Sequence, residues 1–234
     1  MNRRLILVVL ALAATAVAAP PFNGGFACFG PTVGIVDFSG MNSEFRTGGV
    51  RLKKELGSLQ WGFGGGGYVI IDRVVIGGSG WGSSQTVASD LDGLNARVSV
   101  SGGEFDLGYQ VYSLKRLLIA PMLGIGGGGY AIELQQLTGD VPNFGRLLQN
   151  PGRTGTVSFS GLTLSPQLMV TIPISFVGVQ LRGGYCYAPT NPEWTLENGG
   201  KLLIGPAISK GMPFVTLNVA FGGFEGGTRR KGRK

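Results

Sequence analysis

The sequence contains no histidine, and this absence excludes several kinds of chemistry at once. Ser-His-Asp hydrolases, Cys-His nucleophiles and imidazole metal sites all need that side chain. The only two cysteines, Cys28 and Cys186, lack CxxC spacing and further ligands, so neither a zinc site nor a disulfide-rich scaffold is indicated. We therefore expect no metal and no cofactor, and we predict that the chain is not an enzyme, although a Ser-Lys or carboxylate mechanism stays open.

Charge is also scarce, and its excess is confined to the ends of the chain. Charged residues make up 14% of the 234 residues, whereas glycine contributes 43. Arg3, Arg4 and five basic residues after Gly227 account for the formal net charge of +7, so the rest of the chain is neutral. A surface for nucleic acid is therefore not indicated.

The first residues have the features of a secretory signal peptide. Arg3 and Arg4 precede an apolar run, and small residues come just before Pro20. We predict cleavage after a signal peptide of residues 1–19. No later apolar run reaches the roughly 18 residues that a membrane-spanning helix needs. If the mature chain crosses a membrane, it must do so as strands.

Alternation with period 2 recurs along the mature chain and predicts β-strands. In the last strand Val215, Leu217 and Val219 share one face, while Thr216 and Asn218 share the other. The predicted strands number eight and lie at about 27–38, 59–71, 73–84, 98–111, 117–125, 162–172, 177–187 and 215–222.

One predicted strand changes parity along its length. Val98 and Val100 are out of phase with the later Phe105, and two glycines lie between them. We interpret Gly102-Gly103 as a β-bulge that resets the register.

The connections between these strands alternate in length. We expect tight turns at 71–72, 113–115 and Pro173, and longer links at about 39–57, 85–94, 137–153 and 188–211. A transmembrane barrel produces this order, with short periplasmic turns and long outer loops. The prediction is an all-β fold: an eight-stranded antiparallel up-and-down transmembrane β-barrel over residues 20–224, embedded as a monomer in outer-membrane lipid. A secreted soluble barrel that binds a hydrophobic ligand is the alternative, but its outer face should carry many Lys and Glu side chains.

Together these features resemble the small bacterial outer-membrane barrels of the OmpA and OmpX type. The resemblance covers nearly the whole mature chain, and the segments that look like Gly-rich members are 63–68, 75–78, 125–130 and 150–153. It implies an outer-membrane location and a barrel fold, not a chemistry. Such barrels commonly end on an aromatic residue, whereas Phe221 and Phe224 are followed here by a basic tail of residues 225–234.

The glycine runs satisfy a GxGxxG pattern twice, at Gly62, Gly64 and Gly67 and again at 124–129. Neither run precedes a helical pattern, so a dinucleotide site is not supported. Glycine instead lets the strands of a narrow barrel bend and leaves room for large neighbours. We expect Tyr68 and Tyr130 to pack over glycines of adjacent strands.

The polar faces of the strands predict a network inside the barrel. An eight-stranded barrel is just wide enough to be filled by side chains, and buried charges there should pair. We expect Arg182 to form an ion pair with Glu104 or Asp106, and a proton or ion pathway is the functional alternative. The predicted members of this lumen network are Glu104, Asp106, Gln110, Gln167, Gln180, Arg182 and Asn218.

Aromatic residues near the strand ends could form interfacial girdles: Trp61, Trp81, Tyr109, Tyr112, Tyr185 and Tyr187. Cys28 and Cys186 should lie at opposite ends of the barrel, which makes a disulfide between them improbable. For the tail we predict contact with anionic lipid or cell-wall polymer, with a solvated end as the alternative. The function expected is a structural or loop-display role with a plugged lumen, and a narrow transporter or pore is the alternative.

Overall fold

The computed structural model describes residues 22–48, 52–89, 94–114, 117–136, 153–190, 193–202 and 205–226. The predicted signal peptide, most of the predicted 137–153 link and the basic residues of the predicted tail lie outside the described residues. Within the described ranges, no helix is long and apolar enough to cross a membrane.

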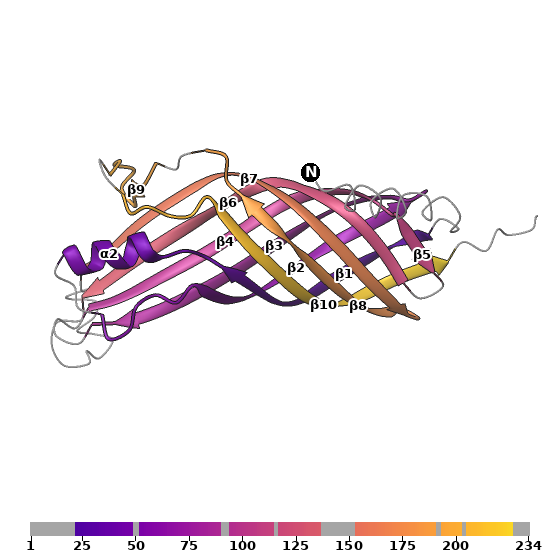
Figure 1. Ribbon diagram of the computed structural model, residues 1–234, viewed down its shortest axis with the longest axis horizontal. Helices are drawn as coiled ribbons and strands as arrows, with labels where there is room; N and C mark the ends of the chain where they lie inside the picture. Colours follow the sequence, from indigo (N-terminus) through magenta and orange to yellow (C-terminus); the bar gives the residue numbers. More distant parts are fainter. Residues whose placement is uncertain are drawn as a thin grey trace, which may run out of the picture.

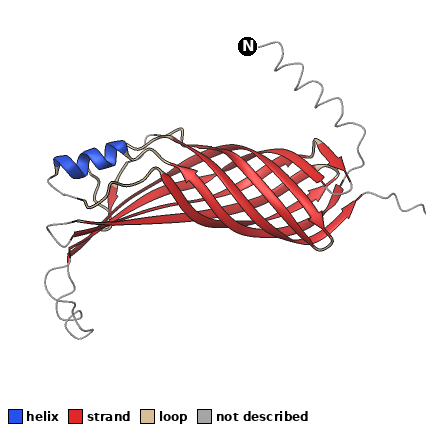
Figure 2. Cartoon of the chain, turned by 60° about the horizontal axis from the view of Figure 1, so that its bottom comes forward, coloured by secondary structure: helices blue, strands red, loops and turns tan. Residues whose placement is uncertain are grey.

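Long antiparallel strands form a closed barrel (Figures 1 and 2). Neighbours in the chain pair with each other, and β1 also pairs with β10, so the ring of hydrogen-bonded strands closes. The predicted fold, an eight-stranded antiparallel up-and-down barrel, is confirmed. The strands of the wall are β1 (Phe22–Ile35), β2 (Leu59–Ile71), β3 (Val74–Ala88), β4 (Leu94–Tyr109), β6 (Leu117–Gln136), β7 (Arg153–Ile174), β8 (Val177–Tyr187) and β10 (Gly211–Gly226).

Two short strands lie beside this wall. β5 (Tyr112–Leu114) pairs with the beginning of β6, and β9 (Thr195–Leu196) pairs with β7. Sequence periodicity does not reveal either strand, because two or three residues are too few to alternate. Tyr112, which was expected in a girdle, belongs to β5.

The connections differ in length, but they do not alternate strictly as predicted. The predicted long link at 85–94 is confined to 89–93, and the predicted tight turn at 113–115 belongs to a longer segment, 110–116, that contains β5. The β2–β3 turn consists of Asp72 and Arg73, both with positive φ, which is the backbone conformation of a tight hairpin turn. The β7–β8 turn lies at Ser175 and Phe176, so Pro173 is inside β7 rather than at the turn. We refer to the end with these short turns as the turn end and to the opposite end as the mouth.

The outer wall of the barrel is apolar. Phe63 is 73% exposed and Trp61 is 65% exposed, although both are large apolar side chains in regular strands. A barrel made for water would bury such residues. The outward-facing apolar side chains, which we call the belt, include Phe29, Val69, Ile76, Phe105, Leu107, Leu123, Ile125, Leu168, Ile172, Val179, Leu181, Val215, Leu217 and Val219.

The predicted bulge at Gly102-Gly103 is wrong. Residues 95–109 of β4 pair with β3 in one unbroken register, and 94–108 pair with β6 in the same way. Ala96, Val98 and Val100 are buried on the same parity as Asp106. The parity change in the sequence therefore has another cause: the interior of the barrel is apolar near the mouth and polar at mid-height.

Helix α2 (Ser39–Thr47) lies in the first long connection, at the mouth (Figure 1). Met41, Asn42 and Phe45 are buried, and the Asn42 side chain makes two hydrogen bonds with the Leu56 backbone. Hydrogen bonds from Ser39 lower the pKa of the exposed Asp37 carboxyl just before the helix. Helix α2 and Leu56 thus pack against the strands at the mouth as a cover.

Candidate functional site

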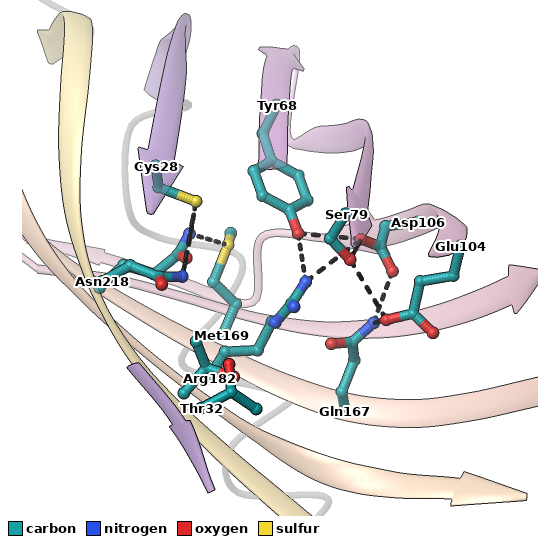
Figure 3. A network of polar contacts seen from close by, with 12 residues as sticks. Cys28, Thr32, Tyr68, Ser79, Glu104, Asp106, Gln167, Met169, Arg182 and Asn218 are labelled. Atoms are coloured by element: carbon teal, nitrogen blue, oxygen red, sulfur yellow. Dashed lines mark hydrogen bonds and ion pairs between the residues drawn. The ribbon is translucent and has the colours of Figure 1, made fainter. Parts of the chain in front are cut away.

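A buried ion pair lies at mid-height in the lumen. Arg182 Nη1 is 3.4 Å from Asp106 Oδ2, and the two side chains are 3% and 0% exposed. Arg182 Nη1 also donates to Tyr68 Oη at 2.5 Å, and Tyr68 Oη donates to Asp106 Oδ2 at 2.9 Å (Figure 3). Three strands far apart in sequence, β2, β4 and β8, meet at this point.

Asp106 receives more donors than Glu104 does. Ser79 Oγ donates to Asp106 at 2.9 Å, and Gln167 Nε2 donates to it at 2.5 Å. The same two donors reach Glu104 Oε1 only at 3.3 and 3.2 Å. Asp106 is therefore the carboxylate that the network is built around, and Glu104 is a second, weakly held acid beside it.

Gly124 on the next strand makes room for both carboxyl groups. A Cβ at this position would lie 2.5 Å from Glu104 Oε2 and 2.9 Å from Asp106 Oδ1. Any side chain there would displace one of the acids. Gly124 thus leaves the space that the two carboxyl groups occupy, in addition to letting the wall bend.

A second group of side chains adjoins the ion pair. Asn218 Nδ2 donates to Gln180 Oε1 at 2.8 Å, and the Cys28 thiol donates to the same oxygen at 3.3 Å. Gln180 Nε2 approaches Met169 Sδ at 3.1 Å. Thr32 and Thr216 share a hydrogen bond of 3.1 Å across β1 and β10.

The structure sorts the predicted lumen residues into three groups. Glu104, Asp106, Gln167 and Arg182 form one cluster, and Gln180 and Asn218 belong to the adjoining one. Gln110 joins neither, because it lies after β4 and its Oε1 accepts from the Phe22 backbone N–H at 3.1 Å. Cys28, Tyr68 and Ser79 were not predicted as members of this network. They lie on the inward-facing positions of β1, β2 and β3, and the alternation of those strands could have identified them.

The two tyrosines expected over glycines behave differently. Tyr68 covers Gly77 of β3, where a Cβ would come within 2.4 Å of the ring, and it is also a network member. Tyr130 stacks on Phe159 at 5.1 Å instead. Trp81, predicted for a girdle, has the inward parity of β3 and packs against the buried mouth cluster, whereas Trp61, Tyr109, Tyr185 and Tyr187 are exposed on the outer wall.

Apolar clusters close the lumen on both sides of the polar layer. The turn-end cluster includes Phe22, Phe26, Ile70, Val75, Leu118 and Met122. The mouth cluster joins side chains of α2 to those of the extended strands and includes Phe38, Met41, Phe45, Val87, Val98, Phe159 and Trp194. The polar network is therefore sealed between two apolar layers.

No group of three or more Cys, Asp or Glu side chains that could hold a metal occurs in the part of the chain that the structure describes. Cys28 and Cys186 are both free thiols. They do not lie at opposite ends of the barrel as predicted, because Cys28 is in the middle of β1, in the polar layer, while Cys186 lies nearer the mouth, one residue before the end of β8.

Comparison with known proteins finds similarity in structure alone. No family model matches the sequence, and no curated protein does either. One similar structure is that of Ail, the attachment invasion locus protein of Yersinia pestis, in complex with the heparin analogue sucrose octasulfate. Its sequence identity to this chain is 9% and the TM-score is 0.48, and the match covers 86% of this chain and 97% of Ail. A major outer membrane protein of Thermus thermophilus is 10% identical with a TM-score of 0.44, covering 84% of this chain and 98% of that protein.

The outer membrane protease OmpT of Escherichia coli also matches, with 8% identity and a TM-score of 0.33, covering 88% of this chain and 96% of OmpT. The prediction that the chain is not an enzyme is corrected, because none of these comparisons establishes that status. The lack of histidine excludes imidazole chemistry only. The chain is a closed eight-stranded antiparallel barrel, similar in fold to small outer-membrane barrel proteins.

Proposed function

We propose that the chain is an outer-membrane barrel with a sealed lumen, whose role is structural and whose mouth presents a packed surface outside the cell. The exposed apolar belt carries this proposal. Trp61 and Phe63 on β2 and Leu217 on β10 each have more than half of their surface exposed, so the belt extends over separate strands of the wall. Lipid acyl chains solvate such a surface well, whereas water does not.

The belt makes a sharp test possible, because a charge on the lipid-facing side of a barrel is costly only at membrane depth. Leu217 lies in the middle of β10 and is 52% exposed, and Leu196 lies in β9 at the mouth and is 37% exposed. A Lys or Arg near the bilayer midplane costs about 2–4 kcal/mol, and near the interface about 0–1 kcal/mol. We expect Leu217→Lys to lower the free energy of unfolding in lipid vesicles and Leu196→Lys to leave it nearly unchanged. Equal effects of the two variants would contradict the membrane placement of the belt.

The orientation follows from the connections. Short turns characterise the periplasmic side of such barrels and long loops the outer side. The mouth, which carries α2 and β9, would then face the exterior. Protease added to intact cells should cleave within the mouth connections and leave the barrel wall protected.

The sealed lumen predicts that the protein does not conduct ions through a bilayer. Side chains of two apolar clusters and the polar layer between them occupy the interior. Purified protein in a planar bilayer should therefore show no steady porin-sized conductance. A reproducible channel would favour the narrow-pore alternative.

Location is tested separately. The protein should be recovered with outer membranes and should migrate differently in detergent gels before and after boiling. Recovery in the soluble fraction with no change in migration would favour a secreted barrel that binds a hydrophobic ligand.

A further inference from the structure

A small cavity lies inside the barrel between the polar layer and the cover at the mouth. Its volume is about 50 Å³. Its lining is mainly apolar and includes Trp81, Tyr130, Phe159 and Met212. Cys186 also lines it, together with a few hydroxyl-bearing residues such as Thr163 and Ser209. None of these residues takes part in the polar network described above.

The cavity lies where the barrel wall is not continuous. Among the described residues, β7 pairs with β9 at Val157 and Ser158 and with β8 from Leu164 onward, so 159–163 have no strand partner on that side. The connection after β8 fills this place: the Thr190 hydroxyl lies 3.0 Å from where a Cβ of Gly161 would be. The rim of the cavity is thus partly a connection, held by a hydrogen bond from Ala188 N to Lys210 O.

Size and lining decide which ligand fits. A water molecule needs roughly 10–15 Å³, and an apolar cavity of about 150 Å³ takes up benzene, so 50 Å³ suits a chain of a few carbon atoms. Aromatic rings and a methionine offer dispersion contacts but few hydrogen bonds, which disfavours water. Lys210 is exposed on the rim and makes no ion pair with the described residues.

We propose that this cavity binds the alkyl end of a short-chain anionic amphiphile, with its head group beside Lys210. The chain enters past Thr190 and contacts Tyr130 and Phe159. Because the cavity is short, carbons beyond the first few remain outside, and added chain length brings little further gain.

The two free thiols provide a built-in assay. Cys186 lines the cavity, whereas Cys28 is buried in the polar layer beneath it. In phosphatidylcholine nanodiscs, methyl methanethiosulfonate should modify Cys186 several-fold faster than Cys28, as mass spectrometry of the two peptides reports. Saturating hexanoate should slow the modification of Cys186 by at least about twofold and leave that of Cys28 unchanged.

Two variants separate the parts of the proposal. Lys210→Gln should weaken protection by hexanoate but not protection by neutral hexanol. Val100→Phe should fill the cavity and remove protection by both, and the shift in gel migration on boiling verifies that this variant folds. The proposal is overturned if hexanoate leaves the Cys186 rate unchanged, or if it slows both thiols equally. Unchanged hexanoate protection in Lys210→Gln would overturn the assignment of the head group.

Discussion

Replacing Arg182 tests the central layer of the lumen most directly. Arg182→Met keeps most of the apolar stem but removes the guanidinium, which contacts Asp106 at 3.4 Å and Tyr68 at 2.5 Å. Asp106 would then be a carboxylate at 0% exposure with no cation beside it. The neutral donors Ser79 and Gln167 would remain, so the loss is one of charge rather than of all hydrogen bonds.

The size of the effect follows from burial. Removing one partner of a buried ion pair costs about 3–5 kcal/mol, because the other charge stays buried and uncompensated. Arg46 provides the matched control, since its ion pair with Glu55 at 2.6 Å is 66% and 61% exposed. Exposed pairs contribute roughly 0–1 kcal/mol. Arg182→Met should therefore lower the free energy of unfolding several times more than Arg46→Met does.

Urea unfolding in lipid vesicles, followed by tryptophan fluorescence, measures both variants on the same scale. Adding Asp106→Asn to Arg182→Met removes the stranded charge and should restore part of the lost stability. If the unfolding midpoint of Arg182→Met equals that of Arg46→Met, the ion pair does not stabilise the barrel. If the double variant is no better than the single one, stem packing rather than charge explains the loss.

Three further predictions concern other parts of the chain. Glu104→Gln should leave stability equal or higher, because it removes an acid that only weak contacts hold, and a clear loss in urea unfolding would contradict this. Gly77→Ala should cost about 1–3 kcal/mol, since its Cβ would meet the Gly67 carbonyl oxygen at 2.3 Å and the Tyr68 ring at 2.4 Å, whereas Gly223→Ala, with nothing within 4 Å, is the control. Deleting residues 227–234 should leave unfolding unchanged but weaken co-sedimentation with anionic vesicles at low salt, each basic residue contributing about 1 kcal/mol. Equal binding by the shortened and full-length chains would exclude that role for the tail.

Several features of the wall could be predicted from local sequence because they depend on local geometry. Successive side chains of a strand point to opposite faces, so the alternation of Val215, Leu217 and Val219 with polar residues already separates outside from inside. The tight turns between β2 and β3 and between β7 and β8 likewise lie within a few residues of their predicted positions. An acid on β4 and Arg182 on β8 could be assigned to the interior for the same reason.

Contacts across the lumen could not be predicted in this way. Periodicity states which face a side chain occupies, but not at which height its partner on a distant strand lies. Gln110 is an even number of residues from Asp106, yet its side chain contacts the Phe22 backbone instead of the ion pair. Nothing in the local pattern marks Tyr68, yet its hydroxyl bonds to both Arg182 and Asp106.

The sequence by itself determined the number of wall strands, their antiparallel order and the apolar outer face of the barrel. Each of these depends on residues that are close together along the chain. Only the tertiary structure decided that β4 runs without a bulge, that Trp81 points inward and that Asp106 rather than Glu104 faces Arg182. These outcomes depend on the closure of the ring, which sets the stagger between strands separated by more than a hundred residues. Closure is a property of all the strands together, and for that reason no single segment encodes it.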